Sequence, residues 1–204
     1  MTAMLPADSR EPLSLRERKK LKTRLAIRRA TYRLLATQGY DATTVEQIAE
    51  AAEVSPSTVV RYFPVKEDIL LTDEHDAVLD ARLRARPADE EPLESLRAVV
   101  TEAVRTALAH EPEETRLRAR LMAEIPAVRA RLAETTAQTA QLLARAIADR
   151  TGRDADDLEV RVFTAAVLAA LREATLCWAE RGQGEDLLAL LDRTVDTLKG
   201  GLSL

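Results

Sequence analysis

The chain has 204 residues, of which 46% are hydrophobic and 31% charged, with one cysteine and two histidines. A lone cysteine excludes an internal disulfide and two histidines offer no zinc-binding spacing, so we expect no metal, no cofactor and a reducing, cytoplasmic setting. No apolar run approaches the roughly 20 residues that cross a bilayer, and the N-terminus lacks the apolar segment of a secretory signal. We therefore expect no membrane partner.

The net charge of −4 hides a segregation of charge along the chain. Residues 1–66 carry twelve Lys or Arg against seven Asp or Glu, whereas the remainder carries eighteen against twenty-seven. The basic excess is densest from Arg10 to Arg33, where ten positive residues face only two acidic ones. Such a block attracts polyanions, although a solvated helix face would have the same composition.

The N-terminal third predicts a tail and three helices. We expect residues 1–13 to form a flexible basic tail, followed by a capping box at 14–17 that opens a helix running to Gly39. The pattern at 43–46 repeats the capping signature and predicts a short helix that ends near Glu53. Ser55 then suits an N-cap with proline behind it, which predicts a third short helix that stops before residue 64.

The rest of the chain also predicts helices, without any strand pattern or internal repeat. A helix over 66–84 fades into a polar linker at 84–92. The segment "VFTAAVLAAL" at 162–171 is apolar all round, so its helix must be covered on more than one side. The fold class is therefore all-α, with about nine helices, of which the later ones cover residues 93–110, 113–123, 126–150, 155–181 and 187–202.

Two short helices that meet across a tight turn, behind a basic helix, form the arrangement of a helix-turn-helix DNA reader. The run from Gly39 to Ser55, continued by Thr58, "RYF" and Lys66-Glu67, resembles the N-terminal domain of TetR-type transcriptional regulators. The resemblance covers about residues 14–70, and the remainder matches only in helix order.

The resemblance implies a three-helix DNA-binding domain at 14–65, a connecting helix at 66–84, and a larger helical domain for ligand binding and dimerisation at 85–204. It also implies that the partners are double-stranded operator DNA, a second copy of the chain and a small-molecule effector. Repression is more usual than activation in this family. We expect an apolar or amphipathic effector, because polar groups are scarce in the C-terminal helices.

The resemblance and the helix geometry together suggest roles for the third helix. Ser57, Val60 and Arg61 lie on turns that can reach base edges, and a guanidinium can bond two acceptors of one guanine. The start of the helix favours an anionic phosphate, and hydroxyl groups nearby fix register on the DNA backbone. The phosphate contacts are accordingly expected from Thr43, Thr44, Ser55, Pro56, Thr58, Tyr62 and Lys66.

Two positions depart from the family pattern. Glu53 stands where a glycine is usual, which indicates either a turn without a left-handed residue or a strained one. Val60 stands where an aromatic is usual and can touch a thymine methyl group, so the DNA preference is expected to differ from that of relatives. Phe63 is expected in the core, and Tyr62 suits either core or surface because its phenol gives an apolar body a polar end.

The C-terminal sites are predicted from apolar helix faces, although plain core is the commoner role of such faces. Arg172 and Glu173 interrupt an apolar helix and can form an ion pair, orient a ligand or reach solvent. Cys177 lacks an electropositive neighbour that would activate it, so we expect it in the core or the dimer interface. The expected pocket residues are Val99, His110, Met122, Ile125, Phe163, Val167 and Leu171. The expected dimer residues are Leu168, Trp178, Leu187, Leu191, Val195 and Leu198.

Two other classes of protein compete with a DNA-binding regulator. An enzyme would need a nucleophile with its base, paired carboxylates or a glycine-rich phosphate loop, and the sequence offers none of these patterns. A helical module that binds another protein would share the helices but not the steep salt dependence of DNA binding. The sequence therefore favours a dimeric, ligand-responsive regulator that is not an enzyme.

Overall fold

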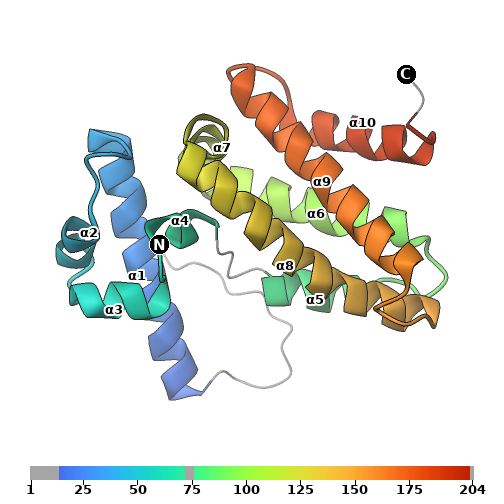
Figure 1. The fold of residues 1–204 in the computed structure, drawn as a ribbon, viewed down its shortest axis with the longest axis horizontal. Coiled ribbons are helices and arrows are strands. Elements are labelled where there is room, and N and C mark those ends of the chain that lie inside the picture. Colours follow the sequence, from blue (N-terminus) through green and yellow to red (C-terminus); the bar gives the residue numbers. More distant parts are fainter. Residues whose placement is uncertain (1–13, 72–75, 203–204) are drawn as a thin grey trace. The chain divides into compact units, whose positions relative to one another are not determined.

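The computed structural model describes residues 14–71 and 76–202, and ten helices and no strand occur in these ranges (Figure 1). The expected tail at 1–13 lies outside the described residues. The chain divides after Ile69 into two compact units. The all-α fold class with an N-terminal helix-turn-helix is confirmed.

The first unit is built on a small apolar cluster. Its helices are α1 (Leu15–Gln38), α2 (Val45–Ala51), α3 (Pro56–Tyr62) and the first residues of α4 (Lys66–Leu71). Each contributes side chains to the cluster, which removes their apolar area from water and fixes the helices against one another. The buried members of this cluster are Ile27, Ile48, Ala49, Val59, Phe63 and Ile69.

The second unit holds six helices around a larger core. They are α5 (Asp76–Arg84), α6 (Pro92–His110), α7 (Pro112–Glu124), α8 (Pro126–Thr151), α9 (Leu158–Glu180) and α10 (Leu187–Lys199). Helix α9 packs against α7, α8 and α10, as the apolar run at 162–171 predicts.

The predicted connecting helix at 66–84 is divided into α4 and α5, with residues 72–75 outside the description. Helix α5 packs on α6 and α8, so it is part of the second unit. The polar linker after it is a fixed turn, because the guanidinium of Arg150 on α8 donates five hydrogen bonds there. Its acceptors are the carbonyls of Leu83 (3.2 Å), Arg86 (2.9 Å), Pro87 (2.7 Å) and Glu90 (3.4 Å) and the hydroxyl of Ser95 (3.0 Å).

Helix α9 corrects the expectation that no apolar segment approaches the length needed to cross a bilayer. Its 23 residues have a mean hydropathy of 1.4 in their most apolar window, so α9 is long and apolar enough to cross a membrane by length and composition. The core helix of a bundle meets the same two criteria but is mostly buried, whereas α9 packs against three neighbouring helices with 28% of its most apolar window buried within the protomer.

Candidate DNA-binding site

Local hydrogen bonds fix the start of α2. The hydroxyl of Thr44 accepts from the backbone N–H of Gln47 at 3.3 Å, and the Gln47 side chain accepts from the N–H of Thr44 at 3.0 Å. This capping box satisfies two donors that a helix start leaves unpaired. It lies one residue later than the pattern at 43–46 suggests.

Thr43 is thereby a buried residue of the turn before α2. Its side chain is only 1% exposed, and its hydroxyl donates to the Gly39 carbonyl at 2.7 Å. The prediction that Thr43 contacts a phosphate is therefore corrected: its hydroxyl stabilises the turn. Thr44, by contrast, is exposed at the helix start.

Helix α3 begins as predicted, with Ser55 as N-cap and Pro56 at the first position. The Ser55 hydroxyl accepts from the N–H of Thr58 at 3.2 Å and lies 2.9 Å from the hydroxyls of both Ser57 and Thr58. Three hydroxyl groups are thus gathered at one end of α3. Hydroxyls both donate and accept, so this cluster suits phosphate oxygens as well as base edges.

The two faces of α3 differ completely in burial. Val59 and, directly after the end of α3, Phe63 are buried in the apolar cluster and anchor the helix. On the opposite face Ser57 and Arg61 are exposed, and Val60 has 48% of its surface exposed. A valine with about half of its surface exposed leaves a methyl-sized apolar contact available to a partner.

Arg61 and Tyr62 lie at the far end of α3. The Arg61 guanidinium carbon is 5.3 Å from the centre of the Tyr62 ring, which is a cation–π distance. Tyr62 is partly buried against the apolar cluster, so its ring serves both core and surface. Phe63 is buried as predicted, with the guanidinium carbon of Arg24 4.6 Å from its ring centre.

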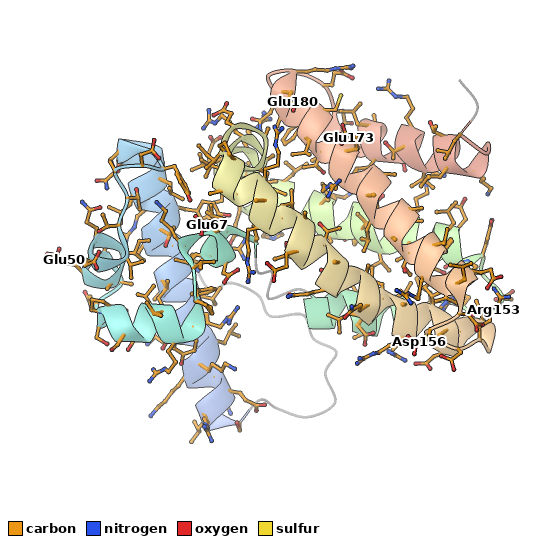
Figure 2. The ribbon with its side chains drawn as sticks, viewed as in Figure 1. Glu50, Glu67, Arg153, Asp156, Glu173 and Glu180 are labelled. Atoms are coloured by element: carbon orange, nitrogen blue, oxygen red, sulfur yellow. The ribbon has the colours of Figure 1, made fainter. Side chains whose placement is uncertain are left out.

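Lys66 has a structural role that the sequence does not predict. Its ammonium group donates to the carbonyls of Tyr40 (2.8 Å) and Thr43 (2.9 Å) and lies 3.8 Å from the Tyr40 ring centre. Glu67, labelled on α4 in Figure 2, accepts a hydrogen bond from the Tyr40 hydroxyl. Burial lowers the pKa of Lys66, and Glu67 and Asp41 oppose this shift. Two of the three ammonium donors therefore hold the turn between α1 and α2, and the phosphate contact stays a prediction for the third.

The turn of the helix-turn-helix contains a strained residue. Glu53 has a φ of 56°, in the left-handed region that favours glycine. Its N–H donates to the Glu50 carbonyl at 3.1 Å, and the N–H of Val54 donates to the Ala49 carbonyl at 2.9 Å. Of the two alternatives that the sequence leaves open, the strained turn is the correct one.

Sequence reasoning missed a basic groove of about 790 Å³ beside the end of α3. Basic residues at helical spacing on α1 were a signal for one wall, but nothing in the sequence indicates that α3 supplies the other wall. The groove is lined by Leu15, Arg16, Lys19, Lys20, Thr23, Arg24, Arg61 and Tyr62.

The predicted C-terminal sites are mostly core. Val99, Val167 and Leu171 belong to the buried cluster of the second unit, with Phe163 packed against it. Met122 is buried and Ile125 is partly buried. His110 is exposed at the end of α6, where a ring nitrogen lies 2.9 Å from the Thr106 carbonyl. Its predicted role as a polar anchor inside a pocket is therefore wrong.

Four of the six residues predicted for the dimer interface are buried inside the protomer. Trp178 is 2% exposed, and its indole N–H donates to the Glu185 carbonyl at 2.8 Å. This hydrogen bond stabilises the turn between α9 and α10. The buried leucines and valine of α10 pack against α6 and α9, so the predicted interface role is corrected for them and for Trp178, whereas it stays a prediction for the partly exposed Leu168 and Leu198. These core residues are Leu187, Leu191 and Val195, with Leu168 and Leu198 packed against them.

Arg172 and Glu173 point in different directions. Glu173 is exposed on α9 (Figure 2), whereas the Nε atom of Arg172 is buried without a hydrogen-bond partner in the described part of the chain. No ion pair joins them within that part, which leaves ligand orientation open for Arg172 and solvent for Glu173. Cys177 is partly buried.

Comparison with known proteins agrees with this geometry. Residues 27–72 match the family model of bacterial regulatory proteins of the tetR family, and residues 90–203 match the model of the MftR C-terminal domain. The HTH-type transcriptional regulator TcmR of Streptomyces glaucescens is 33% identical over 195 residues, which cover 91% of this chain and 86% of that protein. The HTH-type transcriptional repressor KstR of Rhodococcus jostii is 30% identical over 178 residues, covering 84% and 80%.

A solved structure with ligand is also similar. The structure of Thermus thermophilus FadR, a TetR-family transcriptional repressor in complex with lauroyl-CoA, has 27% sequence identity and a TM-score of 0.59 and covers 89% of this chain and 95% of its own. The family models, the relatives and the helix-turn-helix geometry lead to one conclusion. This chain is a member of the TetR family of bacterial transcriptional regulators.

Proposed function

We propose that this regulator is a homodimeric repressor that reads a palindrome-like operator with α3 and changes its DNA affinity when a small apolar or amphipathic molecule binds the second unit. The observation that carries the DNA part is the two-faced α3, with Val59 and Phe63 buried and Ser57, Val60 and Arg61 directed outward. A helix anchored in this way presents its outer face to the major groove.

Selection of binding sites from random DNA tests the operator proposal. We expect an enriched palindrome at near-physiological salt, because a two-fold dimer presents its recognition helices to major grooves about 34 Å apart, or a multiple of this distance. A pool without enrichment would overturn the operator proposal and leave a protein-binding helical module as the better explanation.

Two substitutions on α3 sharpen the same experiment. Arg61→Ala is expected to cost about 1 to 3 kcal/mol of binding and to relax preference at one base pair of each half-site. Val60→Ala is expected to weaken a preference for thymine at one position, because it removes the apolar contact with the methyl group. Equal losses on every sequence would remove both residues from base reading.

The dimer is supported by the outer face of α9. Leu158 is 71% exposed and Val162 56% exposed, and the exposed alanines at 165, 166 and 169 continue the same face. Only 28% of the most apolar window of α9 is buried within the protomer. Such a face is suited to a two-fold contact with its own copy.

Light scattering on Val162→Arg tests this surface. A buried, unpaired charge at a dimer contact is costly, so the variant is expected to be monomeric where the unaltered chain is dimeric. Leu142→Arg on α8, an equally drastic change at another exposed apolar residue, is the matched control and should remain dimeric. A dimeric Val162→Arg variant would contradict the assignment.

The effector proposal is supported by the lauroyl-CoA bound to the T. thermophilus relative and by the buried Nε atom of Arg172, which has no hydrogen-bond partner in the described residues. Calorimetry of the full chain with lauroyl-CoA and with a neutral C12 alcohol would compare an anionic amphipathic ligand with an uncharged one. Arg172→Met should weaken binding of lauroyl-CoA only, if the guanidinium of Arg172 orients an anionic group. Absence of binding to both ligands, without any change of operator affinity, would count against the proposed effector class.

A further inference from the structure

The N-terminal half of α1 contributes no buried residue to the core. Helix α1 has 24 residues, a length of about 36 Å, and its first buried residue is Ile27. None of residues 15–26 is buried, and this part of the helix extends beyond α3 (Figure 1). We call residues 15–26 the α1 arm.

The arm is strongly and unevenly charged. It carries six Lys or Arg and a single acidic residue, Glu17. Glu17 is committed to the capping box: its carboxylate accepts from the N–H and the hydroxyl of Ser14 at 2.8 and 2.7 Å, and these bonds lower its pKa. Its charge therefore stabilises the helix start.

Charge repulsion within the arm is unfavourable for the helix. The pairs Arg16–Lys20, Arg18–Lys22 and Lys20–Arg24 are all cationic pairs four residues apart. Each such pair destabilises a helix by about 0.2 to 0.5 kcal/mol, and the arm gains no compensation from a buried face. A bound polyanion would turn this repulsion into attraction.

The arm and α3 share one concave surface. Arg16, Lys19, Lys20 and Arg24 of the arm line the basic groove opposite Arg61 and Tyr62, and no carboxylate lines it. Within the described residues, no ion pair engages Lys19, Lys20 or Arg61. A groove with several cations and no acid is complementary to a row of phosphates.

We propose that this groove binds backbone phosphates of DNA that lie outside the base pairs read by α3. The inference rests on the proposed operator function, because its position follows from the two residues that the groove shares with α3. DNA is favoured over an anionic membrane by this continuity with the reading helix and by the lack of a broad apolar face on the arm, which membrane-surface helices need.

The consequence is that the arm contributes affinity without sequence preference. Each neutralised phosphate adds about 0.9 to the slope of log affinity against log salt. The triple variant Arg16→Gln/Lys19→Gln/Lys20→Gln should therefore lower that slope by about 2 to 3, with the base preferences unchanged. Glutamine keeps the helix propensity high, and circular dichroism checks that the helix content is retained.

The experiment compares two duplexes, one that ends at the selected half-sites and one extended by several base pairs on each side. The unaltered chain should bind the extended duplex more tightly and with a steeper salt slope, whereas the triple variant should treat the two duplexes alike. The double variant Lys22→Gln/Arg29→Gln removes charges of α1 that do not line the groove, and it should keep the preference for the extended duplex.

Several results would overturn the inference. An unchanged slope in the triple variant would do so, as would an equal loss of duplex discrimination in the double variant. Tighter binding to phosphatidylserine vesicles than to duplex DNA, lost in the triple variant, would assign the groove to a membrane surface instead. If no sequence is selected, the operator proposal fails, and the slope on a random duplex still tests the groove by the same variants.

Discussion

The two units of this protein are stabilised by interactions of different range. In the first unit, helix starts depend on hydrogen bonds between residues three apart, such as Thr44 with Gln47 and Ser55 with Thr58. In the second unit, Arg97 pairs with Asp192 at 2.9 Å and Asp196 at 3.0 Å, about a hundred residues away. A DNA-reading surface made of short helices can be specified locally, whereas a larger helical unit needs distant contacts to fix its helices.

The largest expected effect breaks a distant contact. Arg150→Ala removes five hydrogen bonds from the turn after α5, four to backbone carbonyls and one to the Ser95 hydroxyl, so it should destabilise the second unit by about 3 kcal/mol. Urea unfolding followed by the fluorescence of Trp178, the single tryptophan, measures this unit. Arg145→Ala, an exposed arginine on the same helix, should change stability by less than about 0.5 kcal/mol.

The second prediction concerns a distant polar contact in the first unit, between Lys66 and the turn before α2. Lys66→Met keeps the apolar stem but removes the donors to the Tyr40 and Thr43 carbonyls, so it should cost about 2 kcal/mol of stability in the first unit. Amide hydrogen exchange in α1 and α2 measures the loss. Lys22→Met on exposed α1 should leave the exchange rates unchanged. A Lys66 variant with unchanged exchange but weaker DNA binding would contradict the structural role and support the predicted phosphate contact.

The third prediction is a gain in stability from a local change. Glu53→Gly removes the backbone strain of a non-glycine residue in the left-handed region and should stabilise the first unit by about 1 kcal/mol. Glu50→Gly, three residues earlier and inside α2, should destabilise it by about 1 kcal/mol. Hydrogen exchange again provides the measurement, and a destabilising effect of Glu53→Gly would show that its side chain makes a contribution larger than the strain.

The smallest effect is a pH dependence in the second unit. Hydrogen bonds from Arg86 and Ser95 lower the pKa of Glu90 to about 2. Because the folded pKa lies below the usual value of about 4.5, this contribution to stability is present above pH 4.5 and is lost as the pH falls towards 2. Glu90→Gln should therefore make the loss of stability between these pH values less steep than in the unaltered chain. The exposed control Glu159→Gln should lose stability more steeply than Glu90→Gln over the same range.

Helix boundaries and the reading helix were predictable because their causes are local. Prolines at the first positions of α3, α6, α7 and α8 and the caps at Ser14 and Ser55 lie next to the structure they produce. The buried face of α3 was predicted in part, through Phe63. The role of Lys66 was not, because its two carbonyl partners lie 26 and 23 residues earlier and no pattern links them.

The sequence by itself therefore determined the all-α class, the helix-turn-helix and the outward set on α3, since capping, period and turn chemistry act over three or four residues. Only the tertiary structure decided which apolar side chains are core and which face outward. Leu187 and Val195 are buried within the protomer, while Leu158 and Val162 are exposed, although all four are apolar residues on helices. The tertiary structure also decided that the α1 arm and the end of α3 line one groove, because the approach of two helices depends on the packing of distant side chains around Val59 and Phe63.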